Sequence, residues 1–97
     1  KERQKVVNIL QMYEQAKARN PGAIVLVHIG DFYEAFGDSA KIVQKVIGVT
    51  LTTRRFNGGQ TVVKVAGVPY HSLEAAIDAL QAAGHTVVVL QREAAGA

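Results

Sequence analysis

The sequence AIVLVHI at residues 23–29 is followed directly by GDFYE at residues 30–34. The first stretch is apolar and rich in β-branched residues, which is typical of a central, buried strand. Gly30 interrupts the run, and the following segment, Asp31 to Phe36, predicts a second strand. We expect the two strands to pair as a hairpin within a larger sheet.

The second strand is expected to carry a functional pair of side chains. Residues i and i+2 of a strand point to the same face, so Phe32 and Glu34 project together and Tyr33 points the other way. An aromatic ring that enters a base stack, beside a carboxylate that tests a base edge, suits a sensor of weakened base pairs. A lone Phe is more often a core residue, and Phe36, at the end of the strand, is expected in the core.

Length and composition limit the class of protein. The chain has 97 residues, of which 48% are hydrophobic, and this fits a single folded domain over residues 1–97. Its apolar runs are too short to span a bilayer, so no membrane partner is expected. It contains no cysteine, which excludes disulfides and fits a cytoplasmic location. The ends resemble arbitrary cut points of a fragment or a stand-alone module, and residues 92–97 are expected to be a linker or frayed tail.

The remaining elements complete a mixed sheet. Three helices are predicted from apolar spacing and stop signals, over Arg3–Arg19, Ala40–Ile47 and Ser72–Ala83. Three further strands are predicted over Val49–Thr53, Thr61–Ala66 and Thr86–Leu90, the last of them central. Ser39 and Ser72 are expected to be helix N-caps, and a hairpin turn is expected within residues 54–60. The predicted fold is therefore α/β (α+β), with a mixed β-sheet of about five to six strands flanked by three helices.

Basic residues are concentrated in one part of the chain although the net charge is only +3. No Asp or Glu occurs between Ser39 and Leu73, a span that carries Lys41, Lys45, Arg54, Arg55 and Lys64. A stretch of one sign creates a positive surface that suits a polyanion. The alternative is a solvated face without a partner.

No catalytic or metal-binding constellation is predicted. Asp31 and Glu34 point to opposite faces of one strand, which does not suit a shared metal ion. His71 and Ser72 are adjacent, and adjacent side chains do not meet on a helix, so they do not form a nucleophile pair. The chain has no Gly-Lys pair and hence no P-loop. We expect no catalytic residue, no metal ligand and no cofactor.

Two motifs, GDFYE at residues 30–34 and AGVPYH at residues 66–71, flank the segment LTTRR at residues 51–55. In this order and spacing they resemble the N-terminal mismatch-recognition domain, domain I, of the MutS family of DNA mismatch repair proteins. The resemblance extends over about residues 10–90. It implies that Phe32 stacks on a mispaired or unpaired base at a kink in the DNA, and that Glu34 hydrogen-bonds the same base.

The resemblance implies a non-catalytic DNA-binding domain that senses mispaired or distorted duplex. Its partners would be double-stranded DNA with a mispair or small loop, and the remaining domains of a larger parent protein, which as a complete MutS protein would be an ATPase. Domains of similar appearance occur in mobile-element polyproteins, so mismatch repair and a related mobile-element process both remain open. Arg54 and Arg55 are expected to anchor DNA phosphates, and Lys64, across the hairpin, could join them.

The chain departs from the family pattern at several positions. The family usually has Arg-Met before the Gly-Asp pair, where this chain has His28 and Ile29. After the last strand the family tends to show Glu-Gln, where this chain has Gln91 and Arg92. The hairpin over residues 55–61 also differs. These departures lie near the DNA backbone in the family, and they support an alternative: a protein-interaction module that keeps the domain I fold without binding DNA.

Overall fold

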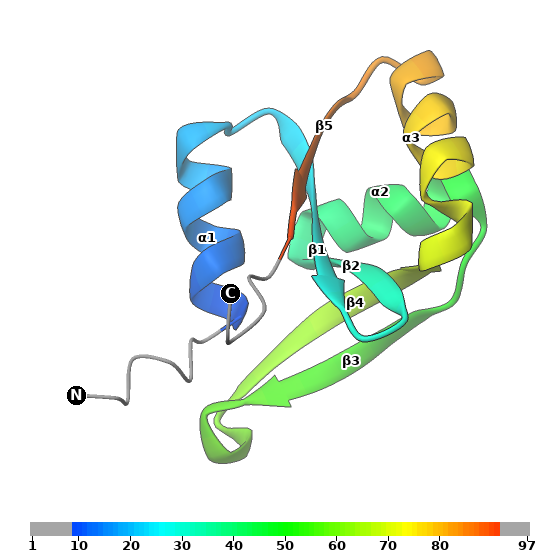
Figure 1. Ribbon diagram of the computed structural model, residues 1–97. Coiled ribbons are helices and arrows are strands. Elements are labelled where there is room, and N and C mark those ends of the chain that lie inside the picture. The colour runs from blue at the N-terminus through cyan, green and yellow to red at the C-terminus, as the bar shows by residue number, and fades with distance from the viewer. Residues whose placement is uncertain (1–8, 92–97) are drawn as a thin grey trace.

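In the computed structural model, which describes residues 9–91, the chain folds into a five-stranded mixed sheet with three helices packed against it (Figure 1). The strand order is β3-β4-β2-β1-β5. In chain order the elements are α1 (Ile9–Arg19), β1 (Ala23–Ile29), β2 (Phe32–Phe36), α2 (Gly37–Ile47), β3 (Leu51–Phe56), β4 (Thr61–Pro69), α3 (Leu73–Ala82) and β5 (Thr86–Leu90), with short 3₁₀ turns at Asn57–Gly59 and Tyr70–Ser72. The predicted α/β (α+β) class with three helices is confirmed.

The hairpin of β1 and β2 lies at the centre of the sheet. Ile29 pairs with Phe32 in the antiparallel register, so Gly30 and Asp31 form a two-residue turn. Gly30 has a φ of +60°, a left-handed conformation that glycine adopts without a steric penalty. This tight turn begins β2 at Phe32, one residue later than predicted. On the other side of β2 lies β4, also antiparallel.

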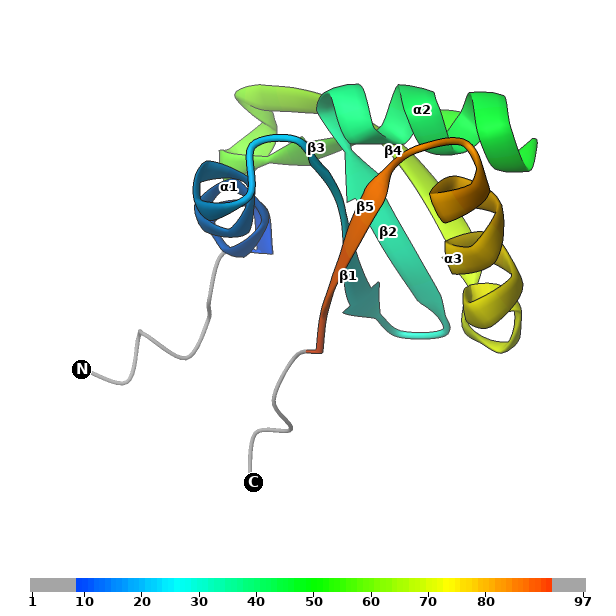
Figure 2. The ribbon, with the colours of Figure 1, turned by 90° about the horizontal axis from the view of Figure 1, so that it is seen from above.

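The sheet has a hydrophobic cluster on each face. Helix α1 contributes Tyr13 to one cluster, which also includes Val27 and Phe36. Helices α2 and α3 contribute Val43 and Leu80 to the other. Figure 2 shows α1 and α3 on opposite sides of the strands β1, β2 and β5. Side chains of alternating parity in the central strands therefore enter different halves of the core.

Ser39 is not the N-cap that the sequence predicted. Helix α2 begins at Gly37, and Ser39 lies within its first turn, fully buried. Its Oγ accepts a hydrogen bond of 3.1 Å from the Tyr13 hydroxyl on α1. Phe36 is at the N-cap position and makes no side-chain cap bond. The contact between α1 and α2 accounts for the polar residue that the local pattern assigned to capping.

The other differences concern strand positions and ends. β5 pairs only with β1, in parallel, so within residues 9–91 it is an edge strand and not the predicted central one. β3 continues to Phe56 and β4 to Pro69, which shortens the predicted hairpin turn and connector. Ser72 occupies the N-cap position of α3 but caps no backbone group. Its Oγ lies 3.3 Å from His71 Nδ1, so the expectation that these adjacent side chains do not meet is wrong, because they lie in a 3₁₀ turn before the helix. The predicted helix start at residues 3–8 and the tail at 92–97 lie outside the described residues.

Replacing Tyr13 with Phe is expected to lower the free energy of unfolding by about 1 kcal/mol, because buried Ser39 loses its partner while the ring packing remains. Burial raises the pKa of Tyr13 above its usual 10.0, and the hydrogen bond to Ser39 only partly offsets this. A folded-state pKa above the unfolded value gives stability that is complete below pH 10.0 and declines above it.

Urea unfolding of wild type and Tyr13→Phe at neutral and alkaline pH measures both effects. Between neutral and alkaline pH, the free energy of unfolding should decline less in Tyr13→Phe than in wild type. Tyr70→Phe is the matched control, because Tyr70 is exposed. An equal alkaline decline in Tyr13→Phe and wild type would contradict the assignment.

Candidate nucleic-acid interface

The two side chains singled out by the sequence share one face of β2. Phe32, the first residue of the strand, is 42% exposed, and Glu34 is buried to 8% exposure. Tyr33, between them, is buried with the opposite parity. Phe36 is fully buried, as predicted. β2 therefore begins at the turn with an exposed aromatic ring, Phe32, and ends with a fully buried one, Phe36.

Packing explains this gradient in exposure. The Tyr13 and Phe56 rings contact Phe36 edge-on, at centroid distances of 5.4 Å and 5.9 Å. At the other end, Phe32 and Glu34 lie against Gly67 of β4: a Cβ there would meet Phe32 Cδ1 at 3.5 Å and Glu34 Cγ at 3.6 Å. A glycine at this position thus adds no side chain between the two residues and leaves the surface between them open.

Glu34 forms an ion pair with Arg54 across β4. Arg54 Nη2 on β3 donates to Oε1 and Oε2 of Glu34 at 2.7 Å and 2.8 Å. The Glu34 side chain is only 10% exposed, whereas that of Arg54 is 41% exposed. Charge-assisted bonds of this length supply the partner that a buried carboxylate requires. Local sequence pattern does not predict this pair, since it depends on the registers of three strands.

The other two predicted phosphate anchors lie elsewhere. Arg55 pairs in register with Val62, and Lys64 pairs with Thr53. By strand alternation both side chains project from the face of the β3–β4 hairpin opposite to Arg54. Figure 1 shows this hairpin extending away from α2 and α3. The structure brings together Phe32, Glu34 and Arg54, and places Arg55 and Lys64 as exposed charges on the other face of the projecting hairpin.

Two positions where the chain departs from the family pattern contact each other. His28 Nδ1 lies 3.0 Å from Gln91 Oε1, and Gln91 Nε2 donates to the Tyr33 hydroxyl at 3.0 Å. The His28 ring stacks on Tyr33, with centroids 4.6 Å apart and planes 14° apart. The three residues form one connected polar group beside β2.

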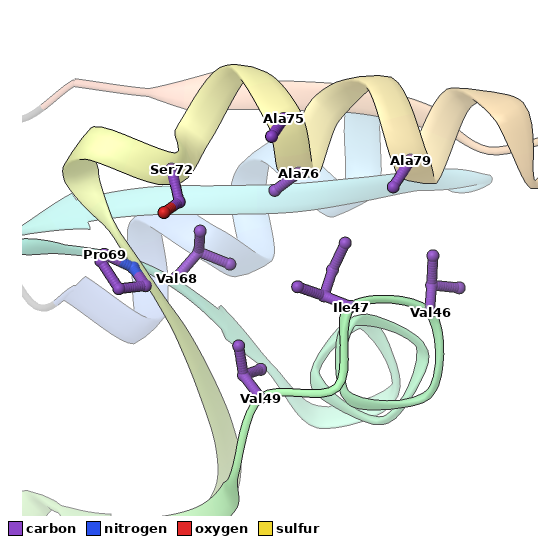
Figure 3. Close-up of a pocket in the computed structure, with 9 residues that line it drawn as sticks. All are labelled: Val46, Ile47, Val49, Val68, Pro69, Ser72, Ala75, Ala76 and Ala79. Carbon is purple, nitrogen blue, oxygen red and sulfur yellow. The ribbon is translucent and has the colours of Figure 1, made fainter.

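The hollows in the surface differ in chemistry. One, of about 320 Å³, contains the ion pair and is lined by Phe32, Glu34, Thr50, Thr52, Thr53, Arg54, Val65 and Gly67. Another, of about 260 Å³, lies between α2 and α3 and is apolar except for Ser72 (Figure 3).

Within residues 9–91 no cluster of three His, Cys, Asp or Glu could hold a metal ion. In the same range no helix has the length and hydropathy to cross a membrane.

Comparison with known proteins gives one consistent result. Residues 7–96 match the family model described as MutS domain I. The DNA mismatch repair protein MutS of Porphyromonas gingivalis is 40% identical over 81 residues, which are 84% of this chain and 9% of that protein. The protein of the same name from Sorangium cellulosum is 39% identical over 90 residues, which are 93% of this chain and 10% of that protein. The one from Fusobacterium nucleatum is 41% identical over 81 residues, which are 84% of this chain and 9% of that protein. The chain thus spans about a tenth of the length of these curated relatives.

Arg54→Ala is expected to lower the free energy of unfolding by about 1 kcal/mol, because it leaves the buried Glu34 carboxylate without its partner. Glu34→Gln should relieve part of this loss, so that the double variant is more stable than the sum of the single effects predicts. A double-mutant cycle by urea unfolding measures the coupling. Arg55→Ala, an exposed charge on the same strand, is the control and should change stability little. Additive effects of Arg54 and Glu34 would contradict the pairing.

Proposed function

This chain belongs to the MutS domain I family of DNA mismatch repair proteins, and from that premise we propose that it senses mispaired or distorted duplex DNA by inserting Phe32 between base steps while Glu34 tests the displaced base. A MutS domain I is a DNA-binding module without catalytic activity of its own. The chain covers about a tenth of its relatives, so ATP-dependent steps would belong to other domains of a parent protein.

The observation that carries the proposal is the exposure of Phe32 beside the turn of the β1–β2 hairpin. Its backbone pairs with Ile29 on one side and Pro69 on the other, so the ring projects from a fixed position. Inserting a ring costs a few kcal/mol of unstacking, and a mispair costs less to open than a Watson–Crick pair. Such discrimination is mainly a reading of DNA deformability, with little dependence on base identity.

Glu34 supplies the chemical test in this proposal. A carboxylate has about four acceptor positions, and Arg54 Nη2 uses one on each oxygen, so acceptor capacity remains for a base N–H such as thymine N3–H. A purine N7 is itself an acceptor and would require a protonated Glu34. Arg54 therefore has two roles here: it orients Glu34, and its exposed side chain can reach a phosphate.

The charged residues set the strength of binding. Arg54, Arg55 and Lys64 are proposed to contact DNA phosphates, which gives salt-dependent affinity without sequence preference. One inserted ring and a few phosphate contacts offset only a small part of the cost of bending. We expect the isolated domain to bind duplex with a Kd in the non-specific range of about 10⁻⁴ to 10⁻⁶ M.

Phe32→Ala should remove the preference for mispaired over paired duplex, since stacking of one aromatic ring on a base contributes about 1 to 3 kcal/mol. Fluorescence anisotropy at low ionic strength, with duplexes that differ in one base pair, measures this preference. Val62→Ala is the matched control, because it removes an exposed apolar side chain that has no ring to stack on a base. Retention of the preference in Phe32→Ala would count against the wedge, and no binding of any duplex by wild type would favour the protein-interaction module.

Arg55→Ala should weaken binding to mispaired and paired duplexes equally and reduce the slope of log K against log salt by about one. Arg54→Ala should weaken binding and also change the ratio between the two duplexes, because it releases Glu34. Titrations at several salt concentrations compare the two variants. Identical behaviour of Arg54→Ala and Arg55→Ala would show that Arg54 acts on DNA only as a charge.

A further inference from the structure

Gly67 occupies a position in the sheet where glycine is unfavourable. It is the only glycine that lies within a strand among residues 9–91, and it pairs in register with Glu34 of β2. Glycine in the interior of a strand weakens the strand, because its unfolded backbone has more conformations to lose and it has no side chain to pack. Gly67 belongs to the AGVPYH motif at residues 66–71, for which the proposed function gives no role.

The backbone at Gly67 does not require glycine. Within residues 9–91, a positive φ, which favours glycine, occurs at Gly30, Gly37, Gly48, Gly58, Gly59 and Gly84. Gly67 is not among them, and neither is Gly22, which is exposed in the turn before β1. No bulge explains Gly67 either, because β4 pairs without interruption with β2 from Val65 to Pro69.

The surroundings of Gly67 also leave room for a side chain. A Cβ would lie 3.5 Å from Phe32 Cδ1 and 3.6 Å from Glu34 Cγ, which are ordinary van der Waals distances. Alanine therefore fits the fold at this position and should stabilise it. Since neither the backbone nor the packing accounts for the glycine, the remaining explanation is a molecule that approaches the strand closely.

The position of Gly67 indicates which part of a DNA molecule approaches it. Gly67 lines the hollow of about 320 Å³ together with Phe32, Glu34 and Arg54. Phe32 is 42% exposed, whereas the Glu34 side chain is only 10% exposed and is therefore recessed. A base that stacks on the exposed ring must bring its edge down toward the sheet to reach this carboxylate. A Cβ on Gly67 would occupy the space between the two side chains.

We propose that Gly67 is a specificity-determining residue, whose missing side chain lets the edge of the base stacked on Phe32 descend far enough to donate an N–H to Glu34. The inference rests on the proposed function and adds to it the feature that makes the recessed carboxylate accessible to a base. The group that fits is the flat edge of a nucleobase with an N–H donor, such as thymine N3–H. Gly67→Ala therefore leaves ring insertion intact and removes the test of the base.

Kd values of the 97-residue chain for two labelled duplexes test this inference. One duplex carries an unpaired thymine, and the other carries an unpaired difluorotoluene, which has the shape of thymine but no N3–H. Wild type should bind the thymine duplex about tenfold more tightly, as expected for a hydrogen bond to a charged group. Gly67→Ala should lose this difference and keep its affinity for the difluorotoluene duplex. Gly22→Ala, at the other glycine without a positive φ, is the matched control and should retain the difference.

Urea unfolding of the same variants separates recognition from stability. Gly67→Ala should unfold at the same urea concentration as wild type or at a higher one, because its backbone and surroundings accept a methyl group. A lower unfolding midpoint would show that packing requires the glycine, and the inference would be overturned.

Glu34→Ala distinguishes failure of this inference from failure of the proposed function. If Glu34→Ala removes the difference between the two duplexes and Gly67→Ala does not, the base reaches Glu34 by another path and only the role of Gly67 is wrong. If Gly67→Ala weakens both duplexes equally, the methyl group obstructs DNA in general, and the role in base testing is overturned. If wild type binds both duplexes alike, Glu34 tests no base N–H, and that part of the proposed function fails together with this inference.

Discussion

The alternation of side chains along β2 is the constraint on which the rest of the molecule depends. Phe36 closes the core beneath α1, Glu34 lies two residues nearer the turn, and Phe32 emerges into solvent, all on one face. Tyr33 and Ala35 fill the opposite half of the core. A shift of one residue in the register would exchange the two sets, which would separate Glu34 from Arg54 and remove Phe36 from the cluster beneath α1. The two-residue turn at Gly30 and Asp31 fixes that register.

In the proposed function, the ion pair between Glu34 and Arg54 would link stability to recognition. A carboxylate that is 10% exposed requires a partner, and Arg54 provides it from a strand that is not adjacent to β2. The same guanidinium is 41% exposed. Under the proposed function, a DNA phosphate that draws Arg54 away would change the hydrogen bonding of Glu34. Phosphate contact and base testing would then be coupled in one pair of side chains, whereas Arg55 and Lys64 lie on the other face of the hairpin.

The sequence was informative wherever a feature depends on local pattern. The apolar run at 23–29, the parity of Phe32 and Glu34, and the burial of Phe36 follow from period-two alternation and turn chemistry. Features that depend on distant partners could not be predicted from local pattern. Ser39 was predicted as a cap because its contact with Tyr13 of α1 is not visible in the local sequence. β5 was predicted as a central strand because an apolar run does not show which strand edges are paired. The Glu34–Arg54 pair requires three strand registers at once, which local spacing does not encode.

The departures from the family pattern have a structural account that bears on DNA binding. His28 and Gln91, two positions where the chain departs from the family pattern, contact each other, with 3.0 Å between His28 Nδ1 and Gln91 Oε1. His28 also stacks on Tyr33, and Gln91 donates to the Tyr33 hydroxyl, so the pair supports the back of β2. The departure at His28 therefore has a packing role within the fold, and it does not by itself favour a protein-interaction module over a DNA-binding one.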